Sequence, residues 1–475
     1  MMIAPCSVVR EAEQRAFAEG RTTSAALMDA VVERLFAALR RCFPMVPQRV
    51  VVYAGTGNNA GDAIGLAARF GCPVVLRAAG TLSADSERQW QLVADGCYAE
   101  TAPDPAPHTL ILDGLLGSGA HGALRPAYAA LTEEMNTLRE RCEHSLLVAV
   151  DVPTGLDADT GAVCGPVVRA DVSCPIGCVK PGMLADGAED AVGRLLPVEL
   201  PGIALTPAVA DRVLSAEEAC VQLPRRAYSC FKNRAGRVAI VAGSVGMLGA
   251  AQLCAEAAVA AGAGLVVLYC HADTYPLLAA RVAPEVMVKP VASYADIDEP
   301  QARALVIGPG LGQLPAEEAA ALHALAHSFC GTVVLDADGL NLAAAENWAF
   351  GPNMILTPHP GEMRRLDPRP AVSRRETVQR FLAEHDVTLL LKGARTLIAD
   401  RRACYYNSTG GPYMANGGQG DVLSGVIGAL AAQGLSPLRA AAAGANRCGL
   451  AAERAWAAKG YAGVTPASAV SDALR

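Results

Sequence analysis

Several features are missing from this sequence of 475 residues, and each absence excludes a class of protein. No uninterrupted apolar run approaches the ~20 residues of a membrane-spanning helix, and no apolar stretch of signal-peptide length opens the chain. Lys and Arg number 40 against 47 Asp and Glu, which gives a formal net charge of -7 without any basic block. We therefore expect a cytoplasmic protein that binds neither nucleic acid nor a membrane surface.

Zinc-type cysteine pairs and aromatic residues are scarce as well. None of the 15 cysteines forms a CxxC pair, and no paired histidines follow Cys174 and Cys178 at the spacing of a zinc site. Reduced and mostly buried thiols are expected instead. Aromatic residues make up only 5% of the chain beside 46 glycines, a composition typical of a large α/β enzyme with tight turns rather than of an all-β protein.

What the sequence does contain is a repeated alternation of short apolar runs and helix-length segments. The runs are apolar on both faces, which predicts parallel strands covered by helices. Helices are expected over residues 24–43, 422–430 and 437–457. Strands are expected at residues 50–53, 74–76, 110–112 and 146–150, and again at 238–241, 265–268, 305–307, 333–335, 354–356 and 388–391.

A proline-rich stretch at residues 196–224 has no sustained periodicity and is the best linker candidate between the two series of strands. The chain is long enough for about three average domains, or for two large ones. We predict two doubly wound α/β domains, at residues 1–210 and 211–475, the first a Rossmann-like three-layer sandwich.

Ligands of open parallel sheets bind beyond the carboxyl ends of the strands, so the residues that follow each strand carry the functional prediction. In the first domain the strand ends are followed by GTGNNAGD at 55–62, by Asp113 with a glycine-rich segment at 114–122, and by Asp151 with PTGLD at 153–157. A single aspartate at such a position can simply cap the next helix. Three such strand ends favour one shared site, and their oxygen-rich side chains suit a hard cation or a sugar-phosphate ligand.

The segments GTGNNAGD, LDGLLGSG and VDVPTGLDADTG resemble the NAD(P)H-hydrate epimerase domain over most of residues 1–205. That family interconverts the R and S forms of NADH or NADPH hydrated on the nicotinamide ring. The resemblance implies that potassium is held by Asn59, Asp113 and Thr154. It implies that the hydrated nucleotide is contacted by Asp151 and by Asn58, Asn59, Ala60, Gly61, Asp62, Gly117, Ser118, Gly119, Ala120, His121, Gly122 and Ala123.

The epimerisation can be understood from the chemistry of the hydrate. Its C6 hydroxyl lies next to the ring nitrogen, so loss of hydroxide gives a nitrogen-stabilised cation to which water returns on the other face. Expulsion needs a proton donor and re-addition needs a base, and we expect Asp151 to alternate between the two roles. Ala60 and Ala63 replace glycines of the family pattern. We expect Ala60 to be tolerated with negative φ, because Gly57 and Gly61 flank it and can take up unusual dihedral angles.

In the second domain the most informative segment is Gly417-Gly418-x-Gly420-Asp421, which runs directly into a predicted helix. The glycines can expose a row of N–H groups, and the helix start adds positive potential, so the segment can hold an anion without a lysine. Asp421 can be a helix cap or, beside a bound phosphate, the base that takes a proton from an attacking hydroxyl. TPHPGE at 357–362 and KGART at 392–396 follow two further strands, and neither the Walker motif nor a dinucleotide fingerprint is present.

Together with AGSVGMLGAA, VIGPGLG and LDADGLN, these segments resemble the ADP-dependent NAD(P)H-hydrate dehydratase, a ribokinase-like enzyme, over roughly residues 215–475. The resemblance implies that Ala250, Gly312, His359 and Asp421 bind the S-hydrate. It implies that Lys392, Gly393, Ala394, Arg395, Thr396 and Gly420 bind ADP, with Mg²⁺ on the nucleotide's phosphates. Phosphorylation of the C6 hydroxyl makes a good leaving group, and elimination then restores the dihydronicotinamide.

We therefore predict a bifunctional repair enzyme for hydrated NADH and NADPH that forms a homo-oligomer. Two alternatives remain open. A ribokinase-like small-molecule kinase would share the glycine-rich anion site and the catalytic aspartate, and would leave a stable phosphorylated product. A nucleotide-sensing protein with an inactive first domain would be consistent with Ala60 and Ala63.

Overall fold

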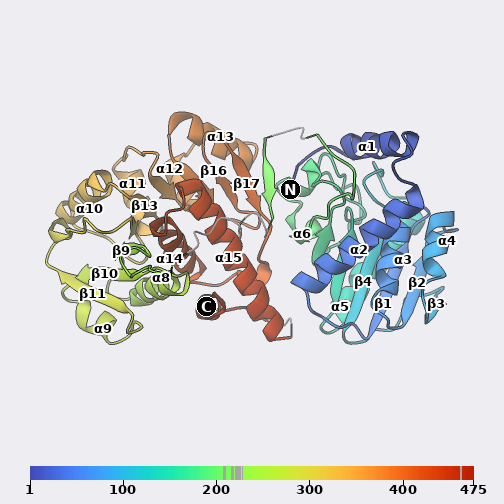
Figure 1. Cartoon of the computed structure of the whole chain (residues 1–475), viewed down its shortest axis with the longest axis horizontal. Helices are drawn as coiled ribbons and strands as arrows, with labels where there is room; N and C mark the ends of the chain where they lie inside the picture. The colour runs from blue at the N-terminus through green and yellow to red at the C-terminus, as the bar shows by residue number, and fades with distance from the viewer. Residues whose placement is uncertain (207–209, 216–218, 220–225, 227, 461–462, 475) are drawn as a thin grey trace. The chain divides into compact units, whose positions relative to one another are not determined.

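The computed structural model describes all residues except 207–209, 216–218, 220–225, 227, 461–462 and 475, and its described residues divide into two compact units (Figure 1). Unit 1 is formed by Met1–Val213 together with Gly460, and unit 2 by Leu214–Lys459 and Gly463–Arg475. The predicted linker at 196–224 spans the division between the two units. Its residues 207–209, 216–218 and 220–224 lie outside the described part of the chain.

Unit 1 contains a parallel sheet in the order β3-β2-β1-β4-β5-β6-β7. Its strands are β1 (Arg49–Ala54), β2 (Val74–Ala78), β3 (Gly96–Tyr98), β4 (Thr109–Gly114), β5 (Leu146–Val150), β6 (Val172–Cys174) and β7 (Arg194–Leu195). All four predicted strands are confirmed, whereas β3, β6 and β7 were missed because each has only two or three residues. The chain moves outward from β1 to β3 and then returns to the other side of β1 at β4, so a topological switch point lies between β1 and β4.

Helices cover both faces of this sheet, which confirms the three-layer sandwich (Figure 1). On one face lie α2 (Ser24–Cys42), α3 (Asn58–Ala68) and α4 (Ala84–Trp90), and on the other lies α5 (Pro126–Arg141). The alternate residues Val51, Tyr53 and Ile111 pack against α5 because successive strand side chains point to opposite faces. Three further short elements complete the unit: α1 (Cys6–Ala18), η1 (Pro181–Leu184) and α6 (Glu189–Val192).

Helix α2 shows how the sequence pattern determines this packing. Its apolar residues recur three and four apart, so Leu27, Val31, Leu35 and Leu39 all fall on one buried side. The helix begins where the Thr23 side chain accepts a hydrogen bond from the Ala26 N–H at 3.2 Å. It ends at Cys42, one residue before the predicted end.

Unit 2 contains a larger sheet in the order β11-β10-β9-β12-β13-β14-β15-β16-β17-β8. The strands from β11 to β15 are parallel, and β16 and β17 add antiparallel to that edge. The predicted strands are confirmed, but β8, β11 and the antiparallel pair β16 and β17 were missed. The strands are β8 (Arg212–Leu214), β9 (Arg237–Val241), β10 (Leu265–His271), β11 (Val286–Val291), β12 (Ala304–Ile307), β13 (Thr332–Leu335), β14 (Met354–Leu356), β15 (Thr388–Leu391), β16 (Leu397–Ala399) and β17 (Cys404–Asn407).

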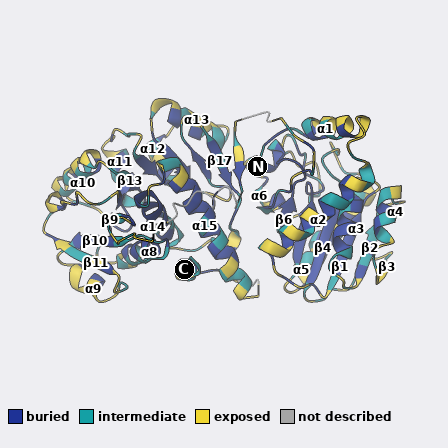
Figure 2. Cartoon of the chain, viewed as in Figure 1, coloured by how far each residue is buried: buried dark blue, intermediate teal, exposed yellow. Residues whose placement is uncertain are grey.

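One face of this sheet packs against α8 (Leu248–Ala260), α14 (Gln419–Ala432) and α15 (Pro437–Ala458). Figure 2 shows α14 as an almost wholly buried helix. Small residues allow this close packing, since a Cβ at Gly425 would lie 2.0 Å from the Cys254 carbonyl oxygen. The remaining helical elements are α9 (Tyr275–Ala279), η2 (Tyr294–Asp296), α10 (Ala316–Ser328), α11 (Asp338–Ala345), α12 (Pro360–Leu366), α13 (Arg374–Glu384), η3 (Pro412–Met414) and α16 (Ala467–Ala473).

The predicted helices at 422–430 and 437–457 are confirmed within α14 and α15. In the described ranges, no helix has both the length and the apolar character that crossing a bilayer requires.

Candidate active sites

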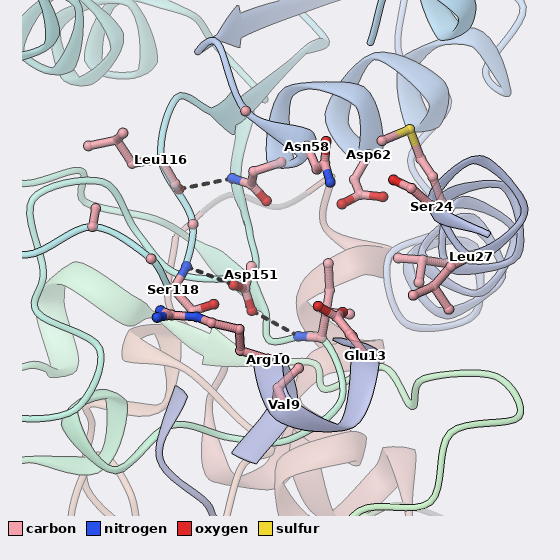
Figure 3. Close-up of a pocket in the computed structure, with 18 of the residues that line it drawn as sticks. Val9, Arg10, Glu13, Ser24, Leu27, Asn58, Asp62, Leu116, Ser118 and Asp151 are labelled. Atoms are coloured by element: carbon pink, nitrogen blue, oxygen red, sulfur yellow. Dashed lines mark hydrogen bonds between the residues drawn. The ribbon is translucent and has the colours of Figure 1, made fainter. Parts of the chain in front are cut away.

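A cavity of about 450 Å³ lies at the switch point of unit 1 (Figure 3). The start of α3, the loop after β4 and the residue that follows β5 form its base. Helices α1 and α2 form a side wall, mostly apolar but with Arg10 and Glu13 on α1. Of the residues predicted to bind the hydrated nucleotide, eight line this cavity: Asn58, Asn59, Asp62, Gly117, Ser118, Gly119, Ala120 and Asp151. The remaining five predicted residues are not in the lining: Ala60, Gly61, His121, Gly122 and Ala123. His121 instead pairs with Asp157 at 3.1 Å.

Asp151 is held at the cavity by a buried ion pair with Lys180, a residue that the sequence analysis missed. Lys180 also donates to the Ile176 carbonyl at 2.9 Å, and Asp151 accepts the N–H groups of Ile176 at 3.1 Å and Ser118 at 3.0 Å. Burial raises the pKa of Asp151, but the charge of Lys180 and these hydrogen bonds outweigh it and hold the pKa below its ordinary value. Asp151 is therefore a carboxylate, in a backbone conformation with φ of 65°.

Two further carboxyl groups, Asp62 on α3 and Glu13 on α1, point into the same cavity (Figure 3). Burial raises the pKa of Asp62 well above its ordinary value, and the charges of Asp151 and Glu13 raise it further. Burial and the charge of Asp151 likewise raise the pKa of Glu13, against a smaller opposing effect of Lys180. The cavity thus combines one carboxyl group whose pKa is lowered with two whose pKa values are raised.

The three predicted cation ligands come together beside this cavity. Asp113 accepts the Thr154 N–H and the Thr154 hydroxyl, both at 2.8 Å, and Thr154 in turn accepts the Leu116 N–H at 3.1 Å. Asn59 donates to the Leu116 carbonyl at 2.9 Å. Burial raises the pKa of Asp113 to about 6, although hydrogen bonds from Thr154 and Leu115 lower it. Among the described residues its hydrogen-bond partners are all neutral, so an oxygen-seeking cation fits this donor set.

Ala60 and Ala63 both lie inside α3 and are completely buried. Ala60 has a helical backbone, so alanine is compatible with the turn as predicted. The predicted reason was wrong, however, because neither Gly57 nor Gly61 has positive φ. Helix α3 begins at Asn58, which places Ala60 in its first turn without any unusual dihedral angle.

A second group of predicted residues meets at the strand ends of unit 2. The loops after β9 and β12 are joined by the Gly243 N–H, which donates to the Pro309 carbonyl at 2.9 Å. A Cβ at Gly310 would lie 3.0 Å from the Ala250 Cβ, and Gly312 donates to Asp338 at 2.8 Å. Ala250 and Gly312 therefore share one end of the sheet, at the switch point between β9 and β12.

Asp336 organises the centre of this site, although the sequence analysis gave it no role. The buried carboxylate accepts from Lys392 at 2.5 Å, from the Thr357 hydroxyl at 2.9 Å and from the Ser424 hydroxyl at 2.6 Å. These contacts tie the ends of β13, β14 and β15 to α14. The next residue, Ala337, has φ of 46° and ψ of -116°, a strained conformation of the kind that accumulates at functional sites.

Asp421 lies in the first turn of α14, close enough to Asp336 and Lys392 for their charges to affect it. Burial raises the pKa of Asp421 to about 6, and the charge of Asp336 raises it while that of Lys392 lowers it. Gly418 has φ of 91°, and a Cβ at Gly420 would lie 3.2 Å from Lys392 Nζ. Glycine at both positions thus lets the start of α14 approach Lys392, so positive charge and a base share one end of the sheet.

His359 caps the start of α12 rather than standing free. Its Nδ1 accepts the Gly361 N–H at 2.9 Å, so the neutral ring carries its proton on Nε2, which lies 3.3 Å from Glu362. In the segment after β15, Gly393 and Ala394 are exposed, whereas the Arg395 side chain is buried. The backbone of this turn and Lys392, rather than the Arg395 guanidinium, are therefore what a nucleotide can reach.

Lys180, Glu13 and Asp336 are the site residues that sequence reasoning missed. Lys180 left one signal, because it is a lone charge in the apolar stretch 172–184. Asp336 stands in the LDADGLN motif directly after a predicted strand, where the strand-end rule applies to it as well as to Asp113. Glu13 left none, since nothing local indicates that α1 closes a cavity at the sheet.

Comparisons with known proteins match both units. Residues 238–475 match the family model of NAD(P)H-hydrate dehydratase, and residues 24–182 match that of the YjeF-related protein N-terminus. The bifunctional NAD(P)H-hydrate repair enzyme of Coxiella burnetii is 35% identical over 471 residues, covering 94% of this chain and 93% of its own length. That of Escherichia coli is 35% identical over 442 residues, covering 89% of this chain and 83% of its own length.

Among solved structures, a ribokinase-like superfamily protein of Enterococcus faecalis is similar with a TM-score of 0.50 and 27% identity. The match covers 56% of this chain and 94% of the solved chain. The ribokinase-like architecture predicted for the second domain is thereby confirmed.

Proposed function

The chain belongs to the family of bifunctional NAD(P)H-hydrate repair enzymes, and from this premise we propose the reaction of each unit. Unit 1 interconverts the R and S forms of hydrated NADH and NADPH, and unit 2 dehydrates the S form with ADP, releasing AMP and phosphate. The observation that carries the proposal is that eight of the predicted residues line the cavity at the switch point of unit 1, while in unit 2 Asp421 lies close enough to Lys392 to be affected by its charge. One chain can then use the whole mixed pool of hydrates.

In unit 1 we assign Asp151 as the base that takes a proton from the water adding to C6. Lys180 keeps Asp151 ionised, and the hydrogen bonds from Ile176 and Ser118 fix its orientation. The same contacts make Asp151 a poor proton donor, so the proposal departs from the prediction that this one carboxylate serves both steps. The glycine-rich loop at 117–120 and the start of α3 lie where the nucleotide would bind.

Asn59, Asp113 and Thr154 would hold a potassium ion beside this cavity. A bound cation would supply positive charge next to Asp113, a buried carboxylate with neutral partners among the described residues. Thr154 links Asp113 to the loop after β4 through Leu116. Through this link Asp113 and Thr154 hold the loop after β4 in position. The same loop contains Ser118, whose N–H orients Asp151.

In unit 2 we assign Asp421 as the base that deprotonates the C6 hydroxyl as it attacks the terminal phosphate of ADP. A base with a pKa of about 6 is largely ionised at neutral pH and still accepts a proton effectively. Lys392 and the N–H groups at the start of α14 would stabilise the transferring phosphate. Elimination of phosphate from C6 then restores the dihydronicotinamide ring.

Mg²⁺ would accompany ADP in unit 2. In the described part of the chain, no three His, Cys, Asp or Glu residues are grouped so that they could hold a metal ion. The site therefore suits a Mg²⁺ ion that would be coordinated mainly by the nucleotide's phosphates, as is usual for Mg²⁺. The charges of Asp336 and Asp338 both affect Asp421, so these two carboxylates lie near the proposed base.

One incubation with a mixed pool of R- and S-hydrates, with and without ADP, tests the two assignments together. The wild-type chain should convert the whole pool to NADH when ADP is present. With ADP, Asp151→Asn should form NADH only from the S-hydrate already present, over a period in which uncatalysed epimerisation is negligible. Asp421→Asn should form no NADH. A stable phosphorylated product without NADH absorbance would instead identify a small-molecule kinase. Gel filtration of the same preparation tests the proposed homo-oligomer.

A further inference from the structure

With Asp151 as the base, the other half of the epimerisation, in which the C6 hydroxyl leaves, still lacks a proton donor. Departure of the C6 hydroxyl requires a proton, because hydroxide is a poor leaving group. Lys180 is 1% exposed and donates to both Asp151 and the Ile176 carbonyl. Giving up its proton would leave Asp151 as an uncompensated buried charge, which is costly. The proton must therefore come from another side chain of the cavity.

Glu13 is a carboxyl group in a suitable place. Helix α1 carries it into the cavity wall, whereas Asp151 stands at the end of β5, so the two approach the cavity from different elements (Figure 3). Within the described ranges Glu13 makes neither a hydrogen bond nor an ion pair. It is also partly exposed, so it can exchange its proton with solvent between turnovers.

The surrounding charges support this role. The charges that act on Glu13 are those of the Asp151 carboxylate and the Lys180 ammonium. The charge of Glu13 in turn raises the pKa of Asp62, and Arg10 on the same helix as Glu13 also lines the cavity. Burial and Asp151 raise the pKa of Glu13, while Lys180 lowers the pKa of Asp151. Two carboxyl groups of one cavity whose pKa values are moved apart are the usual arrangement of a catalytic acid and base.

We propose that Glu13 is the catalytic acid of the epimerase and acts with Asp151 as the base, an inference that rests on the epimerase function proposed above. Glu13 gives its proton to the C6 hydroxyl, whose C–O bond breaks with the electron pair on oxygen, releasing water and leaving a cation shared by C6 and the ring nitrogen. Water adds to the other face of C6, and Asp151 takes a proton from it as the new C–O bond forms. One proton has moved from Glu13 to Asp151, and exchange with solvent restores both groups. Conversion of the other epimer runs the same steps in reverse, with protonated Asp151 giving the proton and the Glu13 carboxylate taking one from the adding water.

Asp62 is the competing candidate for the acid. It also lines the cavity with a raised pKa, but Lys180 is not among the charges that affect it. Glu13, by contrast, is affected by the charges of both Asp151 and Lys180, the two members of the ion pair that contains the base. Asp62 is assigned here to contact the bound hydrate.

Glu13→Gln in the full chain tests the assignment, because it removes the proton and keeps the shape. Epimerisation of pure R-hydrate should fall about 10²–10⁴-fold in kcat with KM little changed. Glu13→Asp should retain more activity than Glu13→Gln. The wild-type rate should decline at high pH as Glu13 ionises, and Glu13→Gln should lose that decline. Dehydration of pure S-hydrate should be unchanged, and Glu11→Gln, at an exposed position of the same helix, should behave as the wild type.

The outcomes separate this inference from the function on which it rests. If the wild-type chain does not epimerise, the proposed function of unit 1 fails. If the wild type epimerises and Glu13→Gln keeps more than about a tenth of its kcat, only the acid assignment fails. A collapse of kcat in Asp62→Asn beside a nearly normal Glu13→Gln would transfer the role to Asp62. An unchanged KM in Glu13→Gln excludes misfolding as the cause of a lost rate.

Discussion

Replacing Lys180 with methionine should destabilise unit 1 by about 3–5 kcal/mol at neutral pH, the usual cost of removing one partner from a buried ion pair. Both members are buried, with exposed fractions of 1% for Lys180 and 7% for Asp151. Methionine preserves much of the packing volume, so the loss is mainly electrostatic. The Asp151 carboxylate would keep only the Ile176 and Ser118 N–H groups as partners.

The sign of the pH dependence follows from the pKa of Asp151. In the wild type this pKa is lowered, so Asp151 contributes stability above its unfolded pKa of about 3.9 and loses it as the pH falls through the folded value. Without Lys180, burial dominates and the pKa rises above the unfolded value. The effect of Lys180→Met should therefore be largest at neutral pH and shrink as the pH falls toward about 4, where Asp151 becomes protonated.

The loss of unfolding free energy in Lys180→Met can be measured for unit 1 alone by urea unfolding monitored by tryptophan fluorescence. The chain has 3 tryptophans, and Trp90, which packs edge-on to Tyr98 at 5.0 Å, is the one in unit 1. Phenylalanine at 348 and 456 would leave Trp90 as the reporter. The double variant Lys180→Met with Asp151→Asn should recover most of the loss, because it contains no buried charge. Equal losses in the single and double variants would refute the electrostatic explanation.

Three further substitutions test the other assignments. Asp421→Asn should slow dehydration about 10²–10⁴-fold while ADP still binds. The wild-type dehydration rate should fall as the pH drops below about 6, because Asp421 then becomes protonated. If Asp421→Asn retains more than about a tenth of the wild-type turnover, Asp421 is only a helix cap. Asp113→Ala should abolish potassium dependence of epimerisation and leave dehydration of pure S-hydrate intact, and an epimerase indifferent to replacing potassium with a large organic cation would disprove the site. Ala60→Gly should lower unfolding free energy by about 0.5–1 kcal/mol and change the epimerase rate less than about tenfold, whereas a far larger gain would show that Ala60 impairs the enzyme.

The sequence predicted the functional strand ends of unit 1 because their determinants are local. A strand buried on both faces reads as a continuous apolar run, and the residue after it is marked by a polar or glycine-rich break. Asp113 and Asp151 could be found in this way, and Asp421 by the glycine-rich segment that precedes it and runs into a predicted helix. The antiparallel strands β16 and β17 could not, since they have only three and four residues and leave no long apolar run.

Lys180 and Glu13 show a different limit. Both reach the cavity of unit 1 from outside the strand ends, Lys180 from the residue before η1 and Glu13 from α1. What positions them is packing between elements that are distant in sequence, such as the pairing of Ile3 with Val179. The local sequence around such a residue does not show which distant element it meets, and only the folded structure shows that both side chains reach the cavity of unit 1.

Ala63 shows why a departure from a family pattern has to be judged against its three-dimensional neighbour. A Cβ at Gly114 would lie 2.6 Å from the Ala63 Cβ. The methyl group of Ala63 therefore packs against Gly114 of β4, where there is no side chain to clash with it. Gly114 pairs with Ala54 at the end of β1, directly before the loop that opens the site. The extra methyl group is therefore accommodated by the partner strand, and the start of α3 keeps its place at the cavity with Asn58, Asn59 and Asp62 in the lining. This arrangement favours a working first unit over a nucleotide sensor that has lost its activity, because the substitution fills a gap in the packing and leaves the side chains of the site where the chemistry needs them.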